Sequence, residues 1–236
     1  MERLDKFISG QKGMSRSDAK LLIKKGVVAV NGKTAKSGDA KINPETDTVT
    51  IDGKNTVYRK HIYLMLNKPQ GYVCATEDNV SKTVMELVPE EFRRDGLFPA
   101  GRLDKDTEGF VLITDDGEFA HRILSPRNHV PKVYYCELEH DCADDYAEKL
   151  ANGVVLASGE KCLPAEIKIN EKKNTAYLTI SEGKFHQVKR MFEALGNRII
   201  YLKRVKIGGL SLDEKLVLGA CREIMHKEIA EIEGVF

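Results

Sequence analysis

The chain has 236 residues, of which 42% are hydrophobic and 31% are charged. This composition indicates a folded protein with one large core or two small domains, and it excludes a disordered chain. No apolar run approaches about 18 residues, so no membrane-spanning helix is predicted. The N-terminal residues lack the apolar stretch of a secretion signal, so we expect a cytoplasmic protein.

The net charge of +1 is unevenly distributed along the chain. Residues 1–59 contain 12 basic and 7 acidic residues, a net charge of +5, whereas the other 25 basic and 29 acidic residues give −4. A basic segment in front of a mildly acidic body is typical of an appended module that binds a polyanion, and an ordinary solvated surface is the alternative.

The basic segment has the pattern of a small helical unit followed by a hairpin. Apolar residues at 4, 7 and 8 and again at 19, 22 and 23 predict two short amphipathic helices. Ser15 is the expected N-cap of the second helix, with Asp18 in its first turn. Residues 27–30 are a predicted strand, and Asn31-Gly32 predicts a tight turn.

Three cations of the second helix, Arg16, Lys20 and Lys24, follow one another at intervals of four residues and share one side of that helix. Like charges at this spacing repel each other, and a helix that serves only to fold would gain from alternating signs. The row matches the phosphates of a nucleic-acid strand, and Lys25, Lys33 and Lys36 extend it around the hairpin.

The runs R-L-D-K-F-I-S and S-R-S-D-A-K-L-L-I-K-K-G-V-V-A-V-N-G, within about residues 3–41, resemble the S4 RNA-binding domain. The resemblance implies that this unit binds structured RNA. The cations expected to contact RNA are Arg3, Lys6, Arg16, Lys20, Lys24, Lys25 and Lys33.

Residues 54–60 read as a linker, so we expect a first domain of residues 1–59 and a second of residues 60–236. Strands are predicted at residues 62–66, 110–114, 133–138 and 175–181, and helices at 118–124 and 188–195. Strands and helices do not alternate regularly. The expected fold class is therefore α+β, a small N-terminal domain followed by a domain with a mixed or largely antiparallel sheet.

The motifs of common cofactor and metal sites are missing from the sequence. There is no phosphate loop, dinucleotide fingerprint or nucleophile elbow. The five cysteines are scattered and the six histidines show no metal-ligand spacing. We therefore expect neither a metal nor a cofactor.

Three charged segments remain as candidates for chemistry. Residues 101–109 form a loop rich in charge and bounded by glycines, directly before an apolar strand. Its Asp104 has basic neighbours that favour the ionised form, so it can act as nucleophile or base, or it can simply close a turn. Lys132 opens a strand that carries two tyrosines, and residues 181–192 place Lys189 and Arg190 at a helix start.

Together these segments resemble the pseudouridine synthases of ribosomal RNA. The matching runs are G-R-L-D-K-D-T-E-G, K-V-Y-Y, E-G-K-F-H-Q-V-K-R-M-F, L-N-K-P-Q-G-Y and R-V-K-I-G-G. The G-R-L-D signature is specific to that family, and an S4 domain in front is typical of one branch. Within this branch the chain is most similar to the ribosomal small subunit pseudouridine synthase A group.

The resemblance implies roles for particular residues. Asp104 matches the family's catalytic aspartate, Tyr134 the tyrosine under the target uracil, and Lys189 the basic partner of the aspartate. Arg102 matches the arginine that helps to hold the target nucleotide out of its stack. Lys68, Lys132 and Arg190 are further expected RNA contacts. The implied reaction is the isomerisation of uridine to pseudouridine without a cofactor.

The preferred substrate is 16S rRNA or a small-subunit assembly intermediate, bound by a monomer with no membrane partner. The same reaction on 23S rRNA is the nearest alternative. A non-catalytic S4-type rRNA-binding assembly factor is the alternative of another class. A hydrolase using Asp104 and Asp106 as a carboxylate pair is disfavoured, because residues two apart in a loop rarely hold the separation that such pairs need.

Overall fold

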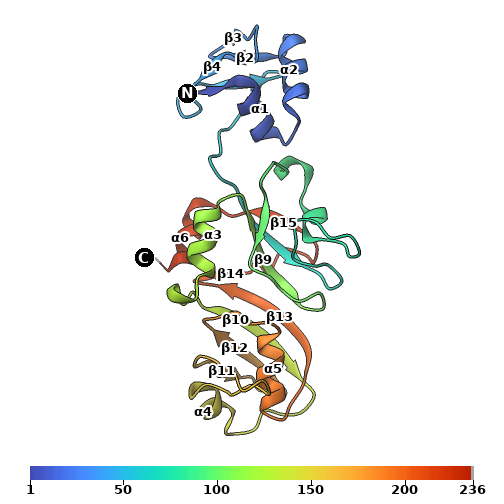
Figure 1. The fold of residues 1–236 in the computed structure, drawn as a ribbon, viewed down its shortest axis with the longest axis vertical. Coiled ribbons are helices and arrows are strands. Elements are labelled where there is room, and N and C mark those ends of the chain that lie inside the picture. The colour runs from blue at the N-terminus through green and yellow to red at the C-terminus, as the bar shows by residue number, and fades with distance from the viewer. Residues whose placement is uncertain (235–236) are drawn as a thin grey trace. The chain divides into compact units, whose positions relative to one another are not determined.

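The computed structural model describes residues 1–234 and divides into two compact units. The N-terminal unit consists of residues 1–62 together with 88–97, and the sheet unit consists of residues 63–87 together with the chain from Phe98 onward (Figure 1). Each unit contains its own cluster of buried apolar side chains.

Two short helices, α1 (Leu4–Lys12) and α2 (Arg16–Lys24), pack against each other in the N-terminal unit. The first ends at Gly13, which has a φ of 60°. The second begins after Ser15, whose hydroxyl accepts a hydrogen bond from the Asp18 amide at 3.1 Å. The predicted cap is confirmed, and both helices bury the apolar faces that their spacing predicts.

The strands of this unit are short and antiparallel. A two-stranded sheet pairs β1 (Glu2–Arg3) with β4 (Lys41–Ile42). A second sheet has the order β3 (Lys33–Thr34), β2 (Val28–Val30), β5 (Val49–Ile51) and β6 (Lys54–Thr56). The helices and β2 and β5 share one core, built from Leu4, Phe7, Ile8, Ala19, Ile23, Val28, Ile42 and Val49.

Two tight turns close the hairpins of the second sheet. Asn31 and Gly32 have φ values of 50° and 77°, as the two-residue turn requires. Asp52 and Gly53 repeat the arrangement with φ values of 48° and 72°. The expectation that residues 54–60 form a linker is therefore wrong in its first half, because the second turn folds β6 back onto β5.

Nine strands among the described residues form the large sheet of the sheet unit. Its main path runs in the order β11 (Glu166–Ile169), β12 (Thr175–Ile180), β10 (Lys132–Leu138), β13 (Ile199–Ile207), β9 (Glu108–Thr114), β7 (Tyr63–Lys68) and β15 (Cys221–Glu223). β8 (Phe98–Ala100) pairs with β9, and β14 (Leu210–Ser211) pairs with β13. Among the paired strands of this sheet within residues 1–234, only β13 and β9 run parallel, so the predicted mixed sheet is confirmed.

Four helices accompany this sheet, α3 (Gly117–Leu124), α4 (Tyr146–Ala151), α5 (Gln187–Ala194) and α6 (His226–Glu233). Single 3₁₀ turns lie at Val84–Leu87 and Pro126–Asn128, and one at Glu90–Phe92 belongs to the N-terminal unit. Helices α3 and α6 lie side by side in Figure 1, and Arg122 and Glu233 join them at 2.8 Å. None of the helices in residues 1–234 is long and apolar enough to cross a membrane.

Candidate active site and RNA interface

The loop between β8 and β9 carries Asp104, and a buried lysine is hydrogen-bonded to the backbone of that loop. Lys68 is 0% exposed at the end of β7. Its ammonium donates hydrogen bonds to the carbonyl oxygens of Thr107 at 2.7 Å, Asp104 at 3.0 Å and Lys105 at 3.3 Å, and to that of Pro69 at 3.2 Å. The prediction that Lys68 contacts RNA is therefore wrong, because its ammonium is buried and donates its hydrogen bonds to backbone carbonyls.

The strand that follows the loop approaches β13 very closely. Gly109 has a φ of 103°, and a Cβ placed on it would lie 2.2 Å from the carbonyl oxygen of Arg204. Only glycine fits both the backbone conformation and this contact. The close approach brings the Asp104 loop next to the side chains of β10 and β13.

Asp104 is joined to helix α5 by an ion pair. Its Oδ2 lies 3.2 Å from Lys189 Nζ, and its Oδ1 lies 3.6 Å from His186 Nε2. Lys189 also donates to Asp106 at 2.6 Å. Burial alone would lower the pKa of Lys189, but the two carboxylates raise it above the ordinary value, so the lysine is a cation at neutral pH.

Tyr134 forms part of the floor of the pocket beside this ion pair. It is 8% exposed and lies directly across from Arg204 in the pairing of β10 with β13. The pocket has a volume of about 540 Å³, and Asp104, Lys189, Tyr134 and Arg102 all line it. Three segments far apart in the sequence thus meet around a space within the usual range of small-molecule sites.

Of the remaining predicted residues of the sheet unit, two line this pocket and one does not. Arg102 is exposed on its wall, and Lys132 lines it but is only 9% exposed. Arg190 does not line it. Its guanidinium instead donates to the Ser158 hydroxyl at 2.7 Å and to the Phe185 carbonyl at 3.2 Å. An RNA contact at Arg190 thus has no support from the pocket geometry.

The pocket is also lined by residues that were absent from the predicted site, among them Phe185, His186 and Arg204. The rings of Phe185 and His186 stack with centroids 3.7 Å apart, and Phe185 is 70% exposed. His186 has a φ of 48°, a left-handed conformation that is uncommon outside glycine and often accompanies functional sites. All three belong to runs that carry the family resemblance, but that pattern did not indicate that their side chains meet at the pocket.

The described part of the chain contains no group of three or more His, Cys, Asp and Glu side chains that could hold a metal ion. The pocket presents one aspartate, one lysine partner and one tyrosine to a bound molecule. This set can supply a nucleophile or a base, positioned by a cation and an aromatic surface.

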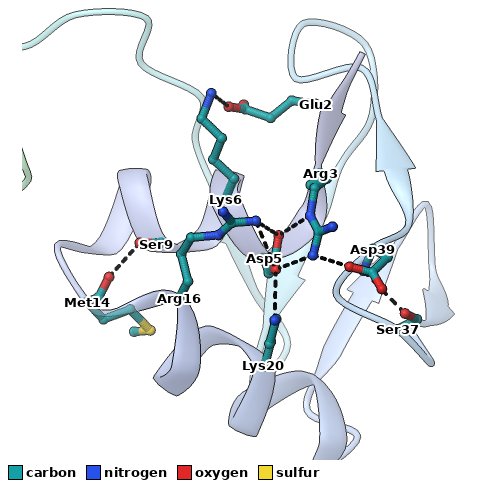
Figure 2. A network of polar contacts seen from close by, with 10 residues as sticks. All are labelled: Glu2, Arg3, Asp5, Lys6, Ser9, Met14, Arg16, Lys20, Ser37 and Asp39. Carbon is teal, nitrogen blue, oxygen red and sulfur yellow. Dashed lines mark hydrogen bonds and ion pairs between the residues drawn. The ribbon is translucent and has the colours of Figure 1, made fainter.

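Three of the seven predicted cations of the N-terminal unit, Arg3, Arg16 and Lys20, converge on one buried carboxylate (Figure 2). Asp5 is 0% exposed and accepts two hydrogen bonds from Arg3, at 3.0 and 2.8 Å. Arg16 donates to it at 3.0 Å, and the Lys20 ammonium lies 3.7 Å away. Arg3 also pairs with Asp39. The hydrogen bonds from Arg3 and Arg16 hold the pKa of Asp5 well below its ordinary value.

The outer parts of these side chains stay in solvent. Arg16 and Lys20 are 51% and 56% exposed, so each can contact a second anion while it is held by Asp5. Lys24, Lys25 and Lys33 are exposed, whereas Lys6 pairs with Glu2 at 3.4 Å. We call Arg3, Arg16 and Lys20 with Asp5 the anchored cation cluster.

Asp5→Asn is expected to weaken RNA binding although it makes the protein one charge more positive. The asparagine no longer fixes the three cations, so they lose their order. The midpoint of thermal unfolding should fall by about 5–10 °C at pH 7. Because the pKa of Asp5 is lower in the folded state, its stabilisation is present above pH of about 4 and is lost as the pH falls further, so parent and variant should converge in acid.

Thermal unfolding from pH 2.5 to 7 and RNA titrations check this prediction. Glu45→Gln is the matched control, because Glu45 is exposed in the same unit and its replacement adds the same charge. It should bind RNA as tightly as the parent or more tightly. Tighter binding by Asp5→Asn would show that only net charge matters.

Replacing Arg16, Lys20 and Lys24 together by glutamine should weaken RNA binding and flatten its salt dependence. Each lost phosphate contact reduces the slope of log affinity against log salt by about 0.7–0.9. Titrations between 50 and 300 mM salt measure the slope. Replacement of the exposed Lys168, Lys172 and Lys173 removes the same charge from the sheet unit. An unchanged slope in the first triple variant would show that Arg16, Lys20 and Lys24 do not contact RNA phosphates and form an ordinary solvated surface.

Comparison with known proteins finds a matching family for each of the two units. Residues 62–194 match the RNA pseudouridylate synthase family, and residues 2–47 match the S4 domain. The chain belongs to the RNA pseudouridylate synthase family and carries an S4 domain at its N-terminal end. The predicted family, the fold class and the identification as an enzyme are confirmed.

Among named relatives, the chain is 47% identical over 234 residues to ribosomal small subunit pseudouridine synthase A of Escherichia coli (strain K12), covering 98% of this chain and 99% of that protein. It is also 47% identical over 230 residues to a Bacillus subtilis (strain 168) protein named uncharacterized RNA pseudouridine synthase YtzG, with 96% of each chain covered. A crystal structure titled pseudouridylate synthase superposes with a TM-score of 0.68 at 39% identity, covering 98% of this chain and 100% of that chain.

Proposed function

We propose that this enzyme isomerises a specific uridine of 16S rRNA to pseudouridine, with Asp104 as the catalytic carboxylate. The observation that carries the proposal is the pairing of Asp104 with Lys189 at 3.2 Å in a pocket whose floor includes Tyr134. The names of the small-subunit relatives support 16S rRNA as the substrate.

The reaction breaks the N1–C1′ bond, turns the detached uracil within the pocket and joins C5 to C1′. Asp104 either attacks C1′ or removes the proton at C2′, and both roles need an ionised carboxylate. Lys189, whose Nζ lies 3.2 Å from Asp104 Oδ2, holds the carboxylate in one orientation. Tyr134 offers a ring on which the uracil can lie while it turns.

The target base has to leave its stack before it can reach this pocket, which costs a few kcal/mol. Arg102, exposed on the pocket wall, is suited to occupy the space that the base vacates and to contact the flanking phosphates. Substrate and product contain the same atoms, and nothing is oxidised or reduced. The proposed chemistry therefore calls for no cofactor.

The N-terminal unit supplies RNA affinity in this proposal, through the anchored cation cluster. We assign RNA binding to residues 1–59 and catalysis to residues 60–236, acting as a monomer in the cytoplasm. The substrate is naked 16S rRNA or a small-subunit assembly intermediate. The same reaction on 23S rRNA is the second candidate, because it uses the same site and the same S4 domain.

Release of tritium from RNA labelled at C5 of uridine tests the function directly, because the isomerisation must displace the hydrogen at C5. Purified protein is incubated with labelled 16S and 23S transcripts and with small-subunit assembly particles. Release from 16S rRNA or from these particles supports the proposal, and release from 23S rRNA alone overturns the substrate. Absence of release from all three favours a non-catalytic assembly factor.

A further inference from the structure

Two buried cations flank Tyr134 on the floor of the pocket. Lys132 precedes Tyr134 by two residues on β10, and Arg204 lies across from Tyr134 on β13. Residues two apart on a strand, and residues directly paired across strands, share one face of the sheet. All three line the pocket, yet Lys132 is only 9% exposed and Arg204 only 4%.

Neither cation has an anionic partner among residues 1–234. Arg204 donates through Nε to the Phe110 carbonyl at 2.8 Å, but its buried Nη2 has no hydrogen-bond partner. Lys132 forms no salt bridge there. Burial, together with the nearby charge of Arg204, lowers the pKa of Lys132 to about 8.

The carboxylates that line the pocket are already paired with other cations. Asp104 lies 3.2 Å from Lys189, and Glu182 lies 3.4 Å from Lys184. The five basic and two acidic side chains of the pocket give it a net charge of +3, with the histidine neutral. Unpaired charges in the interior are costly, so their presence indicates a site that receives an anion.

We propose that Lys132 and Arg204 stabilise the negative charge that develops on the uracil when it leaves the ribose. This inference rests on the proposed function and adds two residues that act on the base. When the N1–C1′ bond breaks, its electron pair remains on the uracil, and the charge is shared by N1, O2 and O4. C5 then bonds to C1′ and loses its proton while N1 gains one, so the product is again neutral.

The position of the two cations favours the base over a backbone phosphate as the anion. They lie on the pocket floor beside the ring that is to carry the uracil. A phosphate of the RNA strand remains outside and meets exposed cations such as Arg102 first. Donors placed in advance where charge develops commonly contribute about 10²- to 10³-fold to the rate.

The test compares Lys132→Gln with Lys203→Gln under single-turnover conditions. Lys203 lies on the same strand as Arg204 but lines a different pocket, so it is the matched control. We expect Lys132→Gln to slow tritium release by about 10²- to 10³-fold, with RNA affinity within about threefold of the parent. The control should match the parent in both measurements.

A better leaving group should reduce the need for these cations. Fluorine at C5 withdraws electrons, so the 5-fluorouracil anion is more stable than the uracil anion. Loss of 5-fluorouridine from RNA carrying it at the target should therefore slow by only about tenfold in Lys132→Gln. Equal slowing for the two bases overturns the inference, and a loss confined to RNA affinity assigns the cations to a phosphate.

Folding is checked separately. Removing a buried charge without an anionic partner should leave the thermal midpoint unchanged or raise it, and Lys132→Met serves as a second variant of similar length. If the parent releases no tritium from any RNA, the proposed function fails and the inference fails with it. If the parent is active and both Lys132 variants match it, only the inference fails.

Discussion

Asp104→Asn is expected to reduce tritium release at least about 10⁴-fold, as is typical for loss of a group on which the chemical step depends. Asparagine keeps the size of the side chain and can still accept a hydrogen bond from Lys189. It cannot attack C1′ as an anion, and it is not a base. RNA affinity should stay within a fewfold of the parent, because binding relies on the other cations of the two units.

Asp106→Asn is the control for this substitution. Asp106 lies 2.6 Å from the same lysine, closer than Asp104, so the ion-pair distances alone do not identify the catalytic carboxylate. Asp106 does not line the pocket, and its side chain is 69% exposed. We expect Asp106→Asn to lose less than about tenfold. Retained turnover in Asp104→Asn, or an equal loss in both variants, would contradict the assigned role.

Lys68→Met is expected to cost about 3–5 kcal/mol of stability and at least 10²-fold in turnover. Four backbone carbonyls lose a charged donor, and three of them belong to the loop that carries Asp104 and Asp106. The loop then lacks the internal support that fixes the carboxylate against Lys189. Chemical denaturation and single-turnover kinetics measure the two losses on the same preparations.

Lys105→Met provides the comparison for Lys68→Met. Lys105 belongs to the same loop, is exposed, and donates only to the Ser81 hydroxyl at 3.1 Å. Its loss should change stability by no more than about 0.5 kcal/mol. If Lys68→Met has the same stability and rate as Lys105→Met, Lys68 does not hold the loop.

Local features of the fold could be predicted from the sequence because their causes are local. The cap at Ser15, the turn at Asn31-Gly32 and the apolar face of α5 follow from neighbouring residues, and the structure contains all three. The pairing of β9 with β13 joins residues that lie 95 positions apart, such as Gly109 and Arg204. No periodicity within either strand indicates that partner.

The residues of the candidate site were predicted mainly through the family signature. The burial of its charged side chains was not predicted. Lysine, arginine and aspartate are usually found at protein surfaces. From sequence, Lys68 was therefore predicted to contact RNA, and no role was predicted for Asp5. Their roles depend on carbonyls and cations that only the folded chain brings near them.

The short parallel contact between β9 and β13 divides the large sheet into two halves. Only two residue pairs form it, Lys203 with Glu108 and Arg204 with Gly109. The half on one side carries the Asp104 loop, and the half on the other carries Tyr134. Asp104 and Tyr134 therefore lie on opposite sides of this seam, and the backbone pairing of two residues on each strand holds the carboxylate and the ring against one pocket.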